Sequence, residues 1–246
     1  MKRFLFSLAL LLGTSMLSSA TETKFESGSQ QTALIELYTS EGCSSCPPAE
    51  AWISRLKDNS GLWKNFVPLA FHVDYWDRLG WRDRFASKQW TERQLHYAEL
   101  WKNESVYTPC VVQNGRELRD WSSTNVSVPN EKASGVLLAK ATDGKNFAVE
   151  FRPTNAAAGN WDAHLALLGS GVSSKVDAGE NRGRDLKHDF VVLALRDAAM
   201  GRDGDAERAR LTIPTSNESG ARLAVAIWVS PREQLGSVQA TGGWLP

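Results

Sequence analysis

The sequence is short of cysteine, of net charge and of long apolar runs. Three cysteines in 246 residues are too few for a small domain held together by several disulfides. The 28 basic and 28 acidic residues cancel, so the composition does not favour nucleic acid or an anionic membrane as a partner. No repeat or low-complexity tract is present, which excludes collagen-like and disordered chains. The sequence therefore predicts a folded protein that is not a multi-span membrane protein.

Apolar and aromatic residues, by contrast, are plentiful. Apolar residues make up 42% of the chain and charged residues 23%, which is typical of water-soluble globular proteins. The ten tryptophans require a large core or a groove lined with aromatic rings. A chain of this length forms one or two domains.

The one long apolar run lies at the N-terminus. Lys2 and Arg3 precede the apolar stretch 4–12, and the small residues 18–20 follow it. This is the layout of a cleaved secretory signal peptide. The alternative, a membrane anchor, needs roughly 20 apolar residues, whereas Gly13 and its neighbours interrupt this run. We expect the mature chain to have no membrane contact and to lie in an oxidising compartment, where disulfides persist.

Residues 21–121 contain strand and helix patterns in turn. Apolar, β-forming residues predict buried strands at 32–38 and 67–73. Apolar residues at helical spacing predict a helix that begins at Pro47 and another over 87–102. A strand at 110–113, followed by an Asn-Gly turn and a return strand, predicts a hairpin.

Beyond this segment the pattern changes. Residues 122–130 are polar and include a proline, as in a linker. Strand candidates then follow at 135–141, 147–151, 161–168, 190–195, 208–213 and 223–229. Short strands separated by turns favour a β-rich, sandwich-like region. We therefore divide the chain into a signal peptide 1–20, an N-terminal domain 21–121, a linker 122–130 and a β-rich domain 131–246.

The motif Cys43-Ser-Ser-Cys46-Pro47 lies between the first strand and the first helix. A spacing of two residues lets the two sulfurs form a disulfide. The start of a helix favours a thiolate, because the aligned peptide dipoles stabilise negative charge there. In this interpretation Cys43 attacks a disulfide of a partner and Cys46 resolves the mixed disulfide.

Two other interpretations of the cysteine pair remain open. A structural zinc site would need two further ligands; Cys110, His72 and His96 are available, but the chain has no second closely spaced cysteine pair. A permanently closed, structural disulfide is the other alternative.

Several polar and aromatic residues follow the second predicted strand. His72 and Asp74 share one face by the two-residue period of a strand, so they could move a proton to or from the resolving cysteine, or form a structural pair. Tyr75 and Trp76 are candidates for the floor of a groove beside the cysteines, or for simple core. Glu36, inside the first strand, is either a buried proton carrier near the cysteines or a solvent-facing residue.

The motifs carry a resemblance to a family. Segments 36–49 (ELYTSEGCSSCPPA), 71–77 (FHVDYWD), 79–81 (LGW), 85–87 (FAS), 106–109 (VYTP) and 179–184 (GENRGR) resemble blocks of DUF1223, a bacterial family of secreted proteins with a thioredoxin-like fold and no settled biochemical role. The resemblance implies an α/β thioredoxin-like domain with the cysteine pair at a helix N-terminus, followed by the β-rich region. It also implies a periplasmic or secreted location.

The resemblance further implies that Pro109 is a cis-proline beside the cysteine pair. Thr108 would then offer its backbone groups to an extended partner peptide. The residue after this proline is usually glutamine in the family, whereas here it is Cys110, for which a buried thiol outside the mechanism is expected. Asn181, Arg184 and His188 lie in a long stretch without regular pattern, and one interpretation is that they reach across to cap the cysteine pair.

These observations predict an exported thiol–disulfide exchange protein that acts on protein thiols and disulfides without a cofactor. The predicted catalytic residues are Cys43, Cys46, His72 and Asp74, and the predicted substrate-binding residues are Thr108, Pro109, Tyr75 and Trp76. Two alternatives stay open: a non-catalytic thioredoxin-like binding module with a structural disulfide, and a copper- or zinc-handling protein that uses Cys43, Cys46 and His72.

Overall fold

The computed structural model describes residues 22–126, 128–155, 159–216, 218 and 220–246. The predicted signal peptide lies outside the described residues. Within the described part of the chain, no helix has both the length and the apolar character needed to cross a bilayer.

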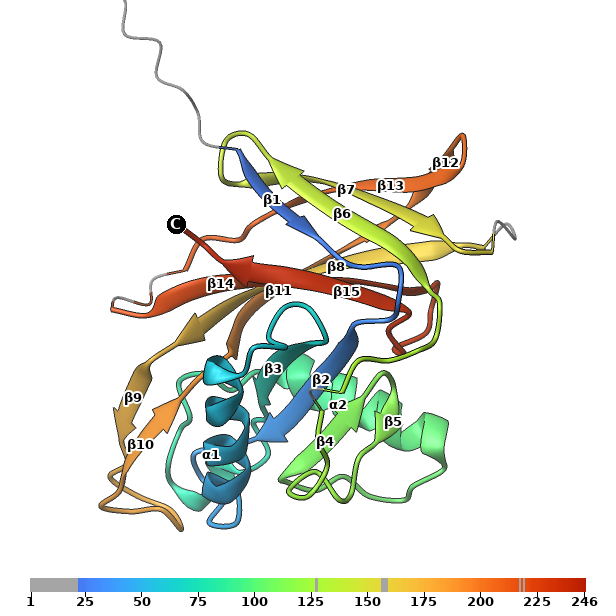
Figure 1. Ribbon diagram of the computed structural model, residues 1–246. Coiled ribbons are helices and arrows are strands. Elements are labelled where there is room, and N and C mark those ends of the chain that lie inside the picture. Colours follow the sequence, from blue (N-terminus) through green and yellow to red (C-terminus); the bar gives the residue numbers. More distant parts are fainter. Residues whose placement is uncertain (1–21, 127, 156–158, 217, 219) are drawn as a thin grey trace, which may run out of the picture.

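An eight-stranded mixed sheet runs through the whole molecule (Figure 1). Its strands, in spatial order, are β15 (Gln239–Trp244), β14 (Arg222–Pro231), β8 (Trp161–Ser170), β11 (Val191–Ala199), β3 (Phe66–His72), β2 (Ala33–Thr39), β4 (Cys110–Gln113) and β5 (Arg116–Glu117). Strands β2 and β3 pair in parallel, and β3 continues in parallel to β11 through Ala70 and Val191. The other neighbours are antiparallel.

A second sheet and a hairpin complete the β structure. The five-stranded sheet consists of β1 (Thr23–Glu26), β6 (Gly135–Ala141), β7 (Asn146–Pro153), β13 (Ala206–Thr212) and β12 (Gly201–Asp203). It covers the β8–β14 end of the large sheet, so this end of the molecule is a two-layer sandwich (Figure 1). Strands β9 (Val172–Lys175) and β10 (Asp185–His188) form a hairpin beside the first helix.

The alternating direction of the side chains along β14 explains why the sandwich end of the molecule has two cores. Side chains of a strand point to opposite faces in turn. Val225 and Ile227 join the core between the two sheets, whereas Ala226 and Trp228 join the core that the helices cover. Both faces of the strand are therefore buried.

The two α-helices lie at the other end of the large sheet. Helix α1 (Pro47–Arg55) begins with two prolines, which suit a first turn because its N–H groups have no partner within the helix. Helix α2 (Lys88–Trp101) begins at Ser87, whose side chain accepts a hydrogen bond from the Gln89 N–H. Thr39 contacts α1 while Tyr38 contacts α2. Because neighbouring strand residues point to opposite faces, the helices cover opposite faces of the sheet, as Figure 1 shows.

The predicted α/β thioredoxin-like fold is wrong. The described residues contain fifteen strands and only two α-helices, so the protein is mostly β-sheet. The physical reason is that β8, β11 and β14 are long apolar strands that extend the sheet beyond β3 instead of folding apart from it. The expected cis bond at Thr108–Pro109 and the position of the cysteine pair before a helix are confirmed.

The proposed division at 122–130 stays a prediction. What the structure adds is that strands from both sides of this segment share one sheet. The main core likewise combines residues from both sides, such as Leu34 and Phe71 with Leu168 and Trp228.

Candidate functional site

Cys43 and Cys46 form a disulfide directly before α1. Strand β2 ends at Thr39 and a short turn leads to the cysteines, so the bond lies where the sheet meets the helix. Both residues are 0% exposed. Burial of both sulfurs keeps reagents and partner proteins away from the bond in this conformation.

A loop of the C-terminal half covers the disulfide. Fully buried Asn181 donates hydrogen bonds from its side-chain amide to the backbone oxygens of Glu41 and Cys43, at 2.9 and 2.8 Å. The Glu180 carboxylate accepts from the backbone N–H and the hydroxyl of Ser44, and these bonds lower its pKa. The interpretation that this segment caps the cysteines is confirmed for Asn181, whereas Arg184 is exposed.

The Thr108 backbone lies against the disulfide. The Thr108 carbonyl oxygen is 3.8 Å from the Cys43 Sγ and accepts a hydrogen bond from the Ser45 hydroxyl at 3.4 Å. The Trp76 indole donates to the Thr108 hydroxyl at 2.8 Å. Thr108 and Trp76, two of the predicted substrate-binding residues, therefore lie near the cysteines, and Pro109 follows Thr108 through the cis bond.

Tyr75, the fourth of these residues, is oriented toward α2. Its hydroxyl donates to the Gln94 side chain at 3.3 Å, and burial raises its pKa to about 12. Its ring lies next to that of Trp76 and is partly buried against the main core.

His72 is fully buried at the end of β3, but its partner is not Asp74. Its Nδ1 lies 2.7 Å from the Asp83 carboxylate, while Asp74 accepts a hydrogen bond from the Thr91 hydroxyl of α2. Burial disfavours the Asp83 carboxylate, yet the contact with His72 outweighs this and lowers its pKa. Asp83 lies in the irregular segment 74–85, where sequence periodicity gives no information on contacts.

A second histidine lies beside the first, between two carboxylates. His188 of β10 contacts Glu50 through Nδ1, and its Nε2 is 3.2 Å from Glu41. Burial disfavours the charged imidazolium, but the two carboxylates stabilise it more strongly and raise the His188 pKa to about 10. Burial also disfavours the Glu50 carboxylate, yet its hydrogen bond with His188 lowers the Glu50 pKa.

Sequence reasoning missed Glu41 and Glu50 as members of this cluster. One signal was present: Glu50 lies among Ala49, Trp52 and Ile53, on the apolar side of α1. A carboxylate on such a face must find a buried partner.

The alternative metal site of Cys43, Cys46 and His72 is not formed in this structure, because the two sulfurs are bonded to each other. Instead, His72 lies with Glu50 and His188, each of which has one ligand-type atom within 4.8 Å of the others.

Glu36 and Cys110 lie away from this cluster. Glu36 is buried and paired with Arg93 at 2.8 Å, and it accepts from the Tyr97 hydroxyl. It is thus neither a proton carrier at the disulfide nor a solvent-facing residue. Cys110 is a buried free thiol, and burial raises its pKa to about 12, as expected for a thiol outside the mechanism.

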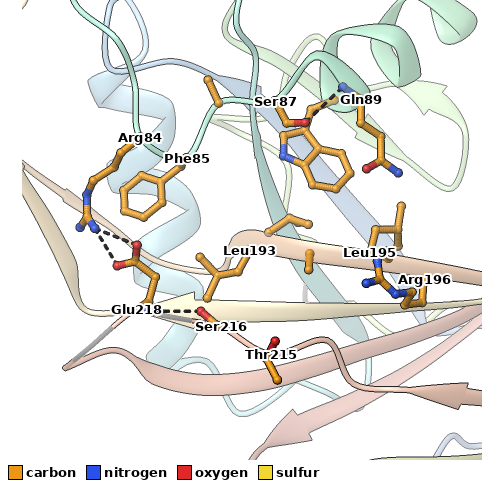
Figure 2. Close-up of a pocket in the computed structure, with 14 residues that line it drawn as sticks. Arg84, Phe85, Ser87, Gln89, Leu193, Leu195, Arg196, Thr215, Ser216 and Glu218 are labelled. Carbon is orange, nitrogen blue, oxygen red and sulfur yellow. Dashed lines mark hydrogen bonds and ion pairs between the residues drawn. The ribbon is translucent and has the colours of Figure 1, made fainter.

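A pocket of about 380 Å³ opens beside β11 and the segment 84–90 (Figure 2). Arg84 and Glu218 form an ion pair at one end, and Leu193 and Leu195 of β11 line the wall. Phe85 lines the same pocket and contacts the rings of both His72 and His188. This one side chain therefore links the pocket to the buried cluster.

The family described as "Protein of unknown function (DUF1223)" matches residues 34–230. The chain belongs to the DUF1223 family. No curated protein matches the chain.

Two solved structures resemble this DUF1223 protein. The protein AGR_C_4864 from Agrobacterium tumefaciens is 23% identical, with a TM-score of 0.65, and the match covers 87% of this chain and 94% of that one. HBP35 of Porphyromonas gingivalis is 13% identical, with a TM-score of 0.56, over 89% of this chain and 76% of that one. At these identities the likeness concerns the fold alone.

Proposed function

We propose that this DUF1223 protein is an exported, non-catalytic binding protein and that Cys43–Cys46 is a structural disulfide. The observation that carries the proposal is that both sulfurs are 0% exposed beneath the Asn181 and Glu180 contacts. A disulfide that no partner thiolate can reach does not exchange in this conformation.

The disulfide is suited to bracing the residues around it. A loop between cysteines three positions apart restrains the unfolded chain little. Its contribution is instead local, because it holds the turn that carries Glu41 and the start of α1, which carries Glu50. Both side chains point into the buried cluster with His188.

Thiol–disulfide exchange is the second candidate. The position of the disulfide before α1 favours it, since the helix N-terminus stabilises a thiolate. The Ser45 hydroxyl, 3.2 Å from the Cys43 Sγ, could donate to that thiolate. In this mechanism Cys43 attacks and Cys46 resolves, and the loop that carries Glu180 and Asn181 has to move first.

The reduction potential separates the two candidates. We expect a value below about −300 mV, the range of structural disulfides, and a value near or above about −270 mV would support exchange instead. Reduction by dithiothreitol should be slow in the native protein and faster in Asn181→Ala, which loses the two bonds to the Glu41 and Cys43 carbonyls. Asn146→Ala, which removes an exposed asparagine side chain of β7 in the five-stranded sheet, is the matched control and should reduce as slowly as wild type.

Alkylation of the unreduced protein tests whether the native structure stays closed around its free thiol, Cys110. Cys110, with its pKa raised to about 12, should remain unlabelled at pH 8 until the chain is unfolded, since the thiolate is the reactive form. Mass spectrometry counts the labels. A single label in the native protein would show that the structure opens around Cys110.

A further inference from the structure

The cluster behind the disulfide contains buried polar atoms without a hydrogen-bond partner. Glu41 Oε1, His72 Nε2 and His188 Nε2 are such atoms, and none of these residues is more than 2% exposed. Glu41 Oε1 and His188 Nε2 are close enough for an ion pair but do not have hydrogen-bond geometry. Unpaired buried polar atoms are costly, so three of them in one place point to a missing partner.

The far side of each imidazole is already occupied by a carboxylate. His72 Nδ1 contacts Asp83, and His188 Nδ1 contacts Glu50. Glu50 in turn accepts a hydrogen bond from the Thr39 hydroxyl at 2.6 Å. Metal-binding histidines are usually oriented in this way, with one nitrogen on a carboxylate and the other presented to the ion.

The charges of the cluster also favour a cation. Three buried carboxylates, Glu41, Glu50 and Asp83, share two imidazoles. Among the described residues, no lysine or arginine forms an ion pair with any of the three. A proton on His188 offsets part of this charge, but it leaves His72 Nε2 without a partner.

We propose that His72 Nε2, His188 Nε2 and the Glu41 carboxylate bind one divalent transition-metal ion such as Zn²⁺, while Asp83 and Glu50 orient the two rings from their Nδ1 sides. This inference deepens the proposed binding function, because it names the ligand class and rests on that function. Imidazole and carboxylate ligands suit Zn²⁺, Ni²⁺, Cu²⁺ or Fe²⁺. Cu(I) prefers soft thiolate ligands, and Cys43 and Cys46 are not thiolates while they form the disulfide.

The donor atoms need only a modest rearrangement. Glu41 Oε1 lies 3.2 Å from His188 Nε2, and ring nitrogens of His72 and His188 lie within 4.8 Å of each other. Zinc bonds of about 2.0–2.1 Å in a tetrahedral site place ligand atoms roughly 3.4 Å apart. Glu41 and His188 are therefore already at the spacing of zinc ligands, and the His72 ring has to approach by roughly 1 Å on binding. Phe85, which contacts both rings and lines the pocket of Figure 2, lies between this site and the outside.

The test is a Zn²⁺ titration of the full chain with its disulfide intact, after removal of metal by a chelator. We expect one Zn²⁺ per chain by calorimetry and metal analysis. The chain has four histidines, which supply both the test and its controls. His72→Gln and His188→Gln should each weaken binding at least tenfold, while His96→Gln and His164→Gln, which lie outside the cluster, should bind as wild type does.

Two measurements on the wild-type chain show whether His72 and His188 bind the metal ion, even if a cluster variant does not fold. Long-range ¹H–¹⁵N spectra should show Nε2 shifts for His72 and His188 on Zn²⁺ addition, but none for His96 and His164. Co²⁺ should give a visible spectrum without a thiolate charge-transfer band. Absence of saturable binding, or shifts confined to His96 and His164, would overturn the proposal.

The same sample separates this proposal from the proposed function. Its reduction potential reports on the disulfide alone, so an exchangeable disulfide with a histidine-bound Zn²⁺ would overturn the structural role and support the metal site. A low reduction potential without Zn²⁺ binding would support the structural role of the disulfide and overturn the metal site.

Discussion

At the scale of single residues, Glu36 and Arg93 form a buried ion pair inside the protein. Arg93 also lies over the rings of Phe71 and Tyr97. Burial disfavours the guanidinium, but Glu36 outweighs it and raises the Arg93 pKa. A sequence search for buried charge finds Glu36, inside an apolar strand, but cannot name a partner 57 positions away.

Removal of either partner should destabilise the fold strongly. We expect Glu36→Leu and Arg93→Met each to lower the free energy of unfolding by about 3–5 kcal/mol, because the remaining charge stays buried and unpaired. The double variant should lose much less than the sum. Urea unfolding measures all three. The exposed pair of Lys88 and Glu92 is the control, and its disruption should cost about 0.2–1 kcal/mol. Additive losses for the buried pair would contradict the prediction.

At the scale of elements, local chemistry sets where the helices begin. Prolines start α1 and a capping serine starts α2, and both signals are visible in the sequence. The strands 32–38 and 67–73 were predicted within a residue or so of β2 and β3. Strands that have too few apolar residues to show a regular spacing are not predicted from the sequence. The hairpin of β9 and β10, which carries His188, is such a case.

The cap of α2 gives a test at this scale. Ser87→Ala removes the acceptor of the Gln89 N–H, so we expect a loss of about 1 kcal/mol in the free energy of unfolding. Ser87→Asp retains an acceptor and should be close to wild type. Thermal and urea unfolding measure the difference. Equal stability of the alanine and aspartate variants would show that the cap contributes nothing.

At the scale of the whole molecule, the two halves of the chain depend on each other. Strand β3 pairs with β11, and the Ala70 N–H donates to the Phe190 carbonyl at 2.8 Å. Asn181, 138 positions along the chain from Cys43, bonds to the turn of the cysteines. Residues that were assigned to separate domains thus complete one sheet and one candidate site.

A fragment of residues 22–121 should therefore not fold on its own. It would expose the β3 edge and the core surface that Leu168, Val192 and Trp228 cover in the whole protein. We expect poor amide dispersion in its NMR spectrum and no cooperative urea transition. A cooperative transition with native-like dispersion would instead show that the boundary near 122–130 separates autonomous domains.

The sequence by itself determined the local features of this protein. Periodicity, proline position and turn residues predicted β2, β3, α1 and α2, and they placed the cysteine pair before a helix. These features depend on residues within a few positions of one another.

The tertiary structure alone decided the order of the strands and the partners of the site. It replaced Asp74 by Asp83 as the partner of His72, and it brought Glu50 to His188, which lies 138 positions away. The physical reason is that a buried charge specifies that it needs a partner, whereas the packing of distant strands and loops determines which residue that partner is.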